Sequence, residues 1–162
     1  MERELQKKLV NTYPNLFEHV ATKSGYFGDV WFTGFQCQDG WYDLIDELLR
    51  TIDFNIRFNS RPKLTIKEVK EKFGGLSFDF RGGDDFIHGI VQFAVHMSYK
   101  TCEYCGTNQN VGRTQGWISV CCKECHDKIH NRRDLVWKPN NNQRLIKLIK
   151  IKKILNKNED GH

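Results

Sequence analysis

The sequence lacks the two features that would direct a protein to or across a membrane. No apolar run approaches the ~18 residues of a transmembrane helix, and residues 1–8 contain no apolar segment like that of a secretory signal. We therefore expect a cytoplasmic protein without a membrane partner. Thiols in that compartment stay reduced, so the clustered cysteines of this chain favour metal binding over disulfides.

The chain is not short of apolar residues, and this excludes a disordered protein. It has 162 residues, of which 39% are hydrophobic and 12% aromatic. This length suggests a single domain, or one domain with a small appended module. We expect an α+β core in residues 1–100, a zinc-finger module in 101–130, and a basic C-terminal helix and tail in 131–162.

Positive charge is concentrated in the C-terminal fifth of the chain. The formal charge of the whole protein is +5, but residues 128–157 contain ten Lys or Arg and one acidic residue, a local charge of +9. This asymmetry indicates an anionic partner, either nucleic acid or a protein associated with it, although a solubilising tail would have the same composition. The cations that we expect to contact phosphates are Lys128, Arg132, Arg133, Lys147, Lys150 and Lys153.

Helices and a hairpin are predicted in the first hundred residues. Residues 2–20 favour one or two short helices broken at Pro14, and residues 41–51 predict an amphipathic helix. Residues 53–81 predict β structure, a small antiparallel hairpin that turns at Gly74-Gly75. A helix over 85–100, capped by Asp84-Asp85, should cover the hairpin. Its expected core-facing residues are Phe86, Ile90, Phe93 and Met97, widened by Ile87, Val91 and Ala94.

The hairpin is a candidate small-ligand site. Its polar face carries several lysines, and adjacent glycines allow a backbone to approach a phosphate closely. The strand, glycine loop and helix of a phosphate-binding loop are not found together here. The candidate ligand-binding residues are Lys70, Lys72, Gly74, Gly75, Trp41 and Tyr42.

Five of the six cysteines fall within residues 102–125, where two Cys-x-x-Cys pairs are separated by sixteen residues. This spacing is typical of a four-thiolate zinc site. It predicts a treble-clef or ribbon-like finger with a short strand at 117–120 and a helix that begins at Cys125. Cys121, His126 or His130 could each replace one member of the second pair. The predicted ligands of Zn²⁺ are Cys102, Cys105, Cys122 and Cys125.

The paired cysteines also resemble the zinc-bearing frame of HNH-type nucleases. In that family the segment between the pairs is usually longer and supplies the metal-binding and general-base histidine. Residues 106–121 contain no histidine and no acidic residue. Four thiolates also leave no open coordination position for hydrolysis. We therefore expect a protein that is not an enzyme, with a degenerate HNH-like nuclease as the lesser alternative.

Residues 143–156 predict a basic amphipathic helix. Lys147, Lys150 and Lys153 lie on one face, whereas Leu145, Leu148 and Ile149 lie on the other. The separation is imperfect, because Ile146 and Ile154 fall on the basic face and Lys152 on the apolar face. The apolar face could pack on its own domain or mediate a homodimer.

Three longer motifs resemble a known family. They are Gly40-Trp41-x-x-Leu44-Ile45-Asp46, then Val69-Lys70-Glu71-Lys72-Phe73-Gly74-Gly75-Leu76, then Cys102-x-x-Cys105-Gly106 followed by Gly116-Trp117-Ile118 and the last cysteine pair. The family comprises small zinc-binding proteins, without an established activity, of tailed bacteriophages, prophages and some bacteria. The resemblance implies action in the cytoplasm of a bacterial host. An anti-defence inhibitor that sequesters a nucleotide signal, or blocks a host defence protein, is the alternative function that this origin suggests.

Overall fold

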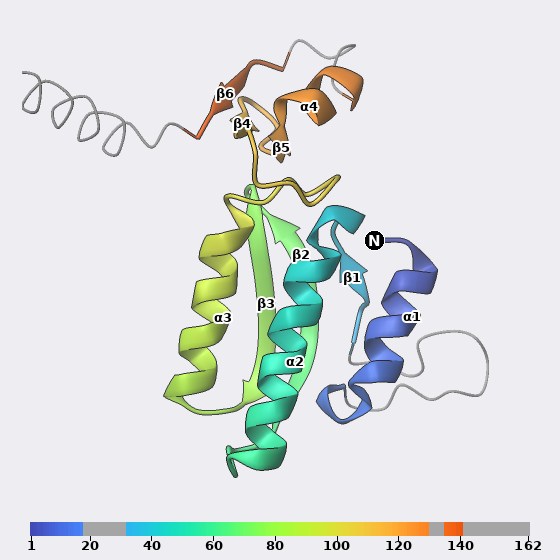
Figure 1. Cartoon of the computed structure of the whole chain (residues 1–162), viewed down its shortest axis with the longest axis vertical. Coiled ribbons are helices and arrows are strands. Elements are labelled where there is room, and N and C mark those ends of the chain that lie inside the picture. Colours follow the sequence, from blue (N-terminus) through green and yellow to red (C-terminus); the bar gives the residue numbers. More distant parts are fainter. Residues whose placement is uncertain (18–31, 130–134, 141–162) are drawn as a thin grey trace, which may run out of the picture.

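The computed structural model describes residues 1–17, 32–129 and 135–140 and has the expected α+β fold. A three-stranded sheet in the order β1-β2-β3 packs against the helices α2 and α3, and α1 lies beside β1 (Figure 1). A second three-stranded sheet, in the order β5-β4-β6, lies beyond the end of the first sheet at which β2 turns into β3 (Figure 1). The division into three domains stays a prediction.

The hairpin consists of β2 (Leu64–Lys72) and β3 (Gly75–Gly82). Lys72 pairs with Gly75, so the two-residue turn is Phe73-Gly74 and not Gly74-Gly75. A β-bulge between Ile66 and Glu68 shifts the register by one residue. Because a bulge inserts one residue into its strand, Val69 faces the core although it is out of phase with Leu64 and Ile66.

A short parallel strand, β1 (Phe35–Gln36), extends the sheet along β2. The sheet is therefore mixed, although its larger part is the expected antiparallel hairpin. Phe35 is buried among aromatic neighbours, and its ring lies 5.0 Å from that of Phe32 in an edge-to-face arrangement. This packing holds the edge strand against the core.

The helix α2 (Tyr42–Phe58) is longer than the sequence pattern predicted. The prediction of β structure from residue 53 was wrong for residues 53–58. The buried stripe that begins at Ile45 and Leu49 continues through Ile52 to Asn55 at helical spacing. Tertiary burial of this stripe keeps the segment helical up to the loop that precedes β2.

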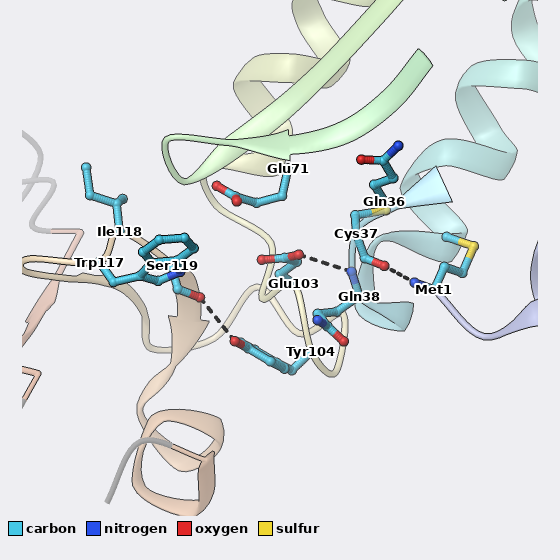
Figure 2. A pocket seen from close by; sticks show the side chains of 10 residues that line it. All are labelled: Met1, Gln36, Cys37, Gln38, Glu71, Glu103, Tyr104, Trp117, Ile118 and Ser119. Carbon is cyan, nitrogen blue, oxygen red and sulfur yellow. Dashed lines mark hydrogen bonds between the residues drawn. The ribbon is translucent and has the colours of Figure 1, made fainter. Parts of the chain in front are cut away.

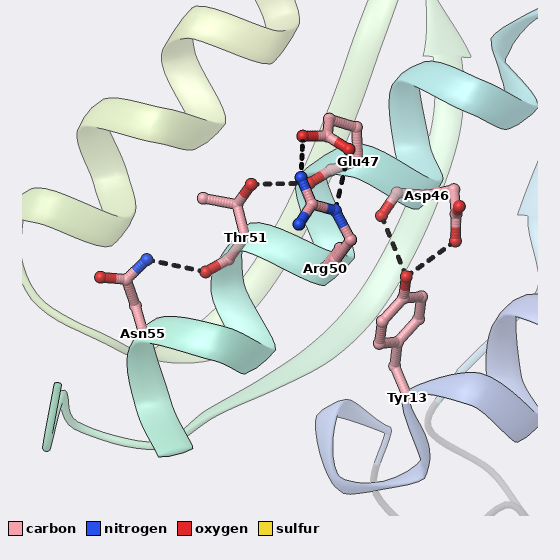
Figure 3. Close-up of polar contacts among 6 residues, drawn as sticks. All are labelled: Tyr13, Asp46, Glu47, Arg50, Thr51 and Asn55. Carbon is pink, nitrogen blue, oxygen red and sulfur yellow. Dashed lines mark hydrogen bonds and ion pairs between the residues drawn. The ribbon is translucent and has the colours of Figure 1, made fainter. Parts of the chain in front are cut away.

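A hydrogen bond from Tyr13, just after the first helix, connects this part of the chain to α2. As predicted, Pro14 ends α1 (Arg3–Thr12) and begins the 3-10 helix η1 (Pro14–Leu16). Between them, the Tyr13 hydroxyl donates to the Asp46 carboxylate at 2.9 Å (Figure 3). Burial, with this carboxylate as the second cause, raises the pKa of Tyr13 to about 12.

The helix α3 (Asp85–Ser98) begins as expected, because the Asp84 carboxylate accepts the N–H of Ile87 at 3.1 Å. The face of α3 that packs on the core differs from the predicted face. The residues that face the core are Ile87, Val91, Ala94 and Ser98. Phe93, expected in the core, is 67% exposed. The Ser98 hydroxyl accepts the N–H of Leu76 at 2.8 Å, and this contact ties the narrower face of the helix to β3.

The second sheet contains β4 (Val111–Thr114), β5 (Val120–Cys122) and β6 (Trp137–Pro139), and the helix α4 (Lys123–Ile129) follows β5. The strand predicted at 117–120 was wrong except for its last residue. Trp117 and Ile118 lie in the β4–β5 loop, where the Thr114 hydroxyl donates to the Trp117 carbonyl at 2.6 Å.

The predicted basic helix at 143–156 lies outside the described residues. Among the helices of the described ranges, none is long and apolar enough to span a membrane.

Candidate metal centre

The four predicted cysteine ligands come together at the end of the molecule that carries the second sheet. Cys102 and Cys105 lie in the loop after α3, Cys122 ends β5, and Cys125 lies in the first turn of α4. A knuckle, a hairpin and a helix that supplies the last ligand follow one another in the order expected of a treble clef. We call residues 101–129, together with β6, the zinc-finger module.

The geometry of the cluster fits one tetrahedral ion. The four Sγ atoms lie within 4.8 Å of one another. A tetrahedral ion with bonds of about 2.3 Å to sulfur needs sulfur–sulfur separations of about 3.8 Å. The Sγ atoms of Cys105 and Cys122 are 3.7 Å apart. The four thiols can therefore hold a metal ion after small side-chain adjustments.

Backbone N–H groups point at the sulfur atoms of the cluster. The N–H of Cys125 lies 3.4 Å from the Sγ of Cys122. Partial burial raises the pKa of Cys105, but a hydrogen bond from the Thr107 N–H and contacts with the other thiols lower it, and the net shift is downward. Hydrogen bonds of this kind stabilise a thiolate, which is the form that binds a metal.

The alternative ligands lie outside the cluster or outside the described residues. Cys121 is buried, and burial raises the pKa of its thiol to about 12, which disfavours the thiolate. The Nε2 atom of His126 lies 3.0 Å from the Leu135 carbonyl oxygen, and its Nδ1 lies 3.2 Å from the Asp127 carboxylate. His130 belongs to the part of the chain that the structure does not describe.

The first knuckle is bound to the core through backbone contacts. The N–H of Gly40 donates to the Glu103 carbonyl at 2.8 Å, and the indole of Trp41 donates to the Thr101 carbonyl at 3.0 Å. A Cβ atom on Gly40 would lie 2.4 Å from the Cys102 carbonyl oxygen. Only glycine permits this approach. From sequence alone Gly40 is no more than a turn signal, because the Cys102 carbonyl that it approaches is more than sixty residues away along the chain.

A pocket of about 380 Å³ lies between the first knuckle, the hairpin and the β4–β5 loop (Figure 2). The described residues that line it include Glu71 and Glu103, and none of these lining residues is a Lys or Arg. Burial raises the pKa of Glu103 to about 7, against a hydrogen bond from the Gln38 N–H that lowers it. Nothing in the spacing of the cysteines indicated that Glu103, between two of them, would be buried in this way.

The predicted ligand-binding residues of the hairpin do not form one surface with the aromatic pair. Trp41 is fully buried in the core, and Tyr42 packs under the Lys8 ammonium at 5.5 Å. Gly75 is covered, since a Cβ atom there would lie 2.3 Å from the Tyr99 ring. Gly75 and Trp41 are therefore not available to a surface ligand.

The lysines of the hairpin differ in their surroundings. Lys70 forms an ion pair of 2.6 Å with Glu68. Lys72 is exposed, and its ammonium lies 5.8 Å from the centre of the Phe73 ring. The charge of Lys72 is therefore available to an anion, whereas that of Lys70 is paired.

Of the predicted phosphate-contacting cations, Lys128 is described, and it is exposed on α4. The other five lie outside the described residues; they are Arg132, Arg133, Lys147, Lys150 and Lys153.

Comparison with known proteins finds no relative: no family model, curated protein or solved structure matches this chain.

Proposed function

We propose that the protein is a non-enzymatic, zinc-stabilised protein that binds nucleic acid through its basic C-terminal region. The observation that supports this best is the convergence of four cysteines immediately before that region. Lys128, three residues after Cys125, is the first cation of the segment with a local charge of +9. A metal held by Cys122 and Cys125 would fix the direction in which this segment leaves the module.

Zinc is the metal that this donor set favours. Four thiolates in a tetrahedron select zinc over the harder divalent cations, which prefer oxygen. The closed ligand set indicates a structural role, because no coordination position remains for water. We expect one zinc per chain by elemental analysis of the purified protein, and intense thiolate-to-metal absorption after replacement by cobalt. A preparation that folds fully with less than a tenth of that zinc would contradict the proposal.

Nucleic acid is the partner that the charge distribution favours. Each phosphate neutralised by Lys or Arg releases counterions, so the affinity should fall steeply with salt concentration. Labelled DNA and RNA, titrated with the zinc-loaded protein at 50 to 200 mM salt, test this. A variant with all six predicted cations changed to Gln should lose most binding and most of the salt dependence. Absence of binding by the unaltered protein at 50 mM salt would refute the proposal.

The alternatives gain less support. Sequestration of a nucleotide signal needs cations around a pocket, whereas the pocket beside the first knuckle offers Glu71 and Glu103. A nuclease needs a free general base, whereas both ring nitrogens of His126 lie against oxygen atoms of neighbouring residues. A host protein that associates with nucleic acid remains compatible with the same charge, and a pull-down that survives nuclease treatment would identify it.

A further inference from the structure

Two exposed aromatic rings lie where the hairpin meets the zinc-finger module. Phe73 and Trp117 are each 74% exposed, more than any other large hydrophobic residue in the described chain. Their segments touch: a Cβ atom on Gly74 would lie 2.6 Å from the side chain of Ile118. The residue after each ring thus contacts the residue after the other, which brings the two exposed segments together.

The backbone of Phe73 is unfavourable for a bulky residue. Phe73 and Gly74 have φ angles of +52° and +78°. A two-residue hairpin turn with positive φ at both central positions is normally built from Asn-Gly or Asp-Gly. An aromatic residue in this region is rare, and the exposed ring recovers little of that cost through burial. A strained, exposed aromatic residue points to a role in binding.

Cations flank these rings. The Lys72 ammonium lies over Phe73, and the Arg113 guanidinium lies 4.5 Å from the centre of the Tyr99 ring. Tyr99 in turn packs on Gly75, the residue after the turn. Within the described chain neither Lys72 nor Arg113 forms an ion pair, and the buried Nε of Arg113 has no hydrogen-bond partner there.

Two acidic groups lie beside this part of the surface. The Glu71 carboxylate accepts the N–H of Gly74 at 2.6 Å and lines the pocket beside Glu103 (Figure 2). On the other side of Arg113, its cross-strand partner in β6 is a further cation, Lys138. Trp117 lines the same pocket, so these two carboxylates border the surface that carries the rings and the cations.

We propose that these residues bind single-stranded nucleic acid, with bases stacked on Phe73 and Trp117 and phosphates held by Lys72 and Arg113. The junction surface comprises Lys72, Phe73, Tyr99, Arg113 and Trp117. Exposed rings beside cations match the unstacked bases of a single strand, whereas the bases of a duplex are already stacked on one another. This inference rests on the proposed function and adds a second contact region to the basic segment.

The test compares three variants for binding to labelled single-stranded oligothymidine, single-stranded oligouridine and a DNA duplex. Trp117→Ala and Phe73→Asn should each weaken binding to single strands by roughly 5- to 150-fold, the range for loss of one stacking contact. Duplex binding should change by less than about 2-fold, because phosphates alone are contacted there. Phe93→Ala removes a ring of similar exposure from α3 and should leave every affinity unchanged.

Phe73→Asn also separates binding from folding. Asn is favoured at this turn position, so its thermal midpoint should equal or exceed that of the unaltered protein while its affinity falls. Arg113→Gln should lower the slope of log affinity against log salt by about 0.7, the value for one phosphate of a single strand.

The outcomes separate failure of the junction surface from failure of the proposed function. If the unaltered protein binds single strands and all three aromatic variants bind equally well, the junction surface is not a binding site, although the proposed function stands. If the unaltered protein binds the duplex but no single strand, the junction surface is again not a binding site and the proposed function again stands. Absence of binding to any nucleic acid overturns both. A preference for oligothymidine or oligouridine identifies the source of the single strand.

Discussion

The core and the zinc-finger module are stabilised in different ways. Among the described residues, the core buries one cluster of twenty-one, which includes Trp41, Phe35 and Ile45. The cluster of the module has five buried residues, and three of them are cysteines. Apolar burial contributes about 25 cal/mol per Å², and ordering one residue costs about 1–2 kcal/mol. So small a cluster cannot order a module of this length, and we expect a metal to supply the difference.

The two modes of stabilisation meet where Gly40 contacts the first knuckle. At Gly40 the contact between them consists of a backbone hydrogen bond to Glu103 and a close glycine approach, and the buried residues of the two parts form separate apolar clusters. The position of the module should therefore depend on metal binding at one side and on core packing at the other. Changes on each side, and between them, test this view.

Removal of a metal ligand should have the largest effect. Cys122→Ser is expected to abolish zinc binding and unfold the module, since structural zinc provides about 10–16 kcal/mol in zinc-finger peptides. Hydrogen exchange should become fast over residues 102–129 and stay slow in α2 and β2. Cys121→Ala, which alters a neighbouring buried cysteine outside the cluster, should retain its zinc. A full complement of zinc in Cys122→Ser would show that another group holds the metal.

A cavity in the core should destabilise the core and leave zinc binding unchanged, which is the reverse of the result expected for a metal ligand. Leu49 is fully buried, and Leu49→Ala should lower the free energy of unfolding by about 2–5 kcal/mol. Urea unfolding measures this loss, and the zinc content should stay at one per chain. The control Phe58→Ala, on the same helix at a site that is 70% exposed, should change stability by less than about 0.5 kcal/mol. Equal losses in the two variants would show that α2 does not pack as described.

A methyl group at the contact between the two parts should have an intermediate effect. In Gly40→Ala the new Cβ would lie 2.5 Å from the Gly106 nitrogen and 2.6 Å from the Cys105 nitrogen. Because these are backbone atoms, we expect a loss of about 1–3 kcal/mol and faster exchange of the Gly40 amide. Gly89→Ala is the matched control. Its Cβ would meet nothing within 4 Å, so it should stabilise α3 by about 0.5–1 kcal/mol. The same sign in both variants would refute the close approach.

The smallest effect is expected from one hydrogen bond in the core. Tyr13→Phe removes the donor to Asp46 (Figure 3) and should cost about 0.5–1.5 kcal/mol at neutral pH. Burial raises the pKa of Tyr13 in the folded state to about 12, against about 10 in the unfolded state. The neutral phenol therefore stabilises the fold fully below pH 10, and this contribution is lost as the pH rises from 10 to 12.

Urea unfolding at several pH values between 8 and 12 checks that window. The stability of the unaltered protein should fall more steeply than that of Tyr13→Phe, and the two curves should converge. Parallel curves over the whole range would mean that Tyr13 titrates normally and that the bond to Asp46 does not persist in solution.

Sequence patterns predicted those parts of the fold that depend on neighbours along the chain. The break at Pro14, the cap at Asp84 and the β-hairpin each follow from local backbone chemistry. Spacing likewise singled out the four cysteines, because a Cys-x-x-Cys turn brings two sulfur atoms to one side of an ion wherever it occurs. The fold class followed from the same local signals.

Only the tertiary structure decided the features that depend on a distant partner. Apolar residues cover two sides of α3, and packing on β3 selected the side with Ala94 and Ser98 instead of the one with Phe93. The turn lies at Phe73-Gly74, and not at the predicted Gly74-Gly75, because Gly75 pairs with Lys72 and belongs to β3. The clash-free approach of Gly40 to the first knuckle joins residues far apart in sequence. Local chemistry fixes how a segment can fold, whereas burial against another segment fixes which of its faces is used and which rings remain at the surface.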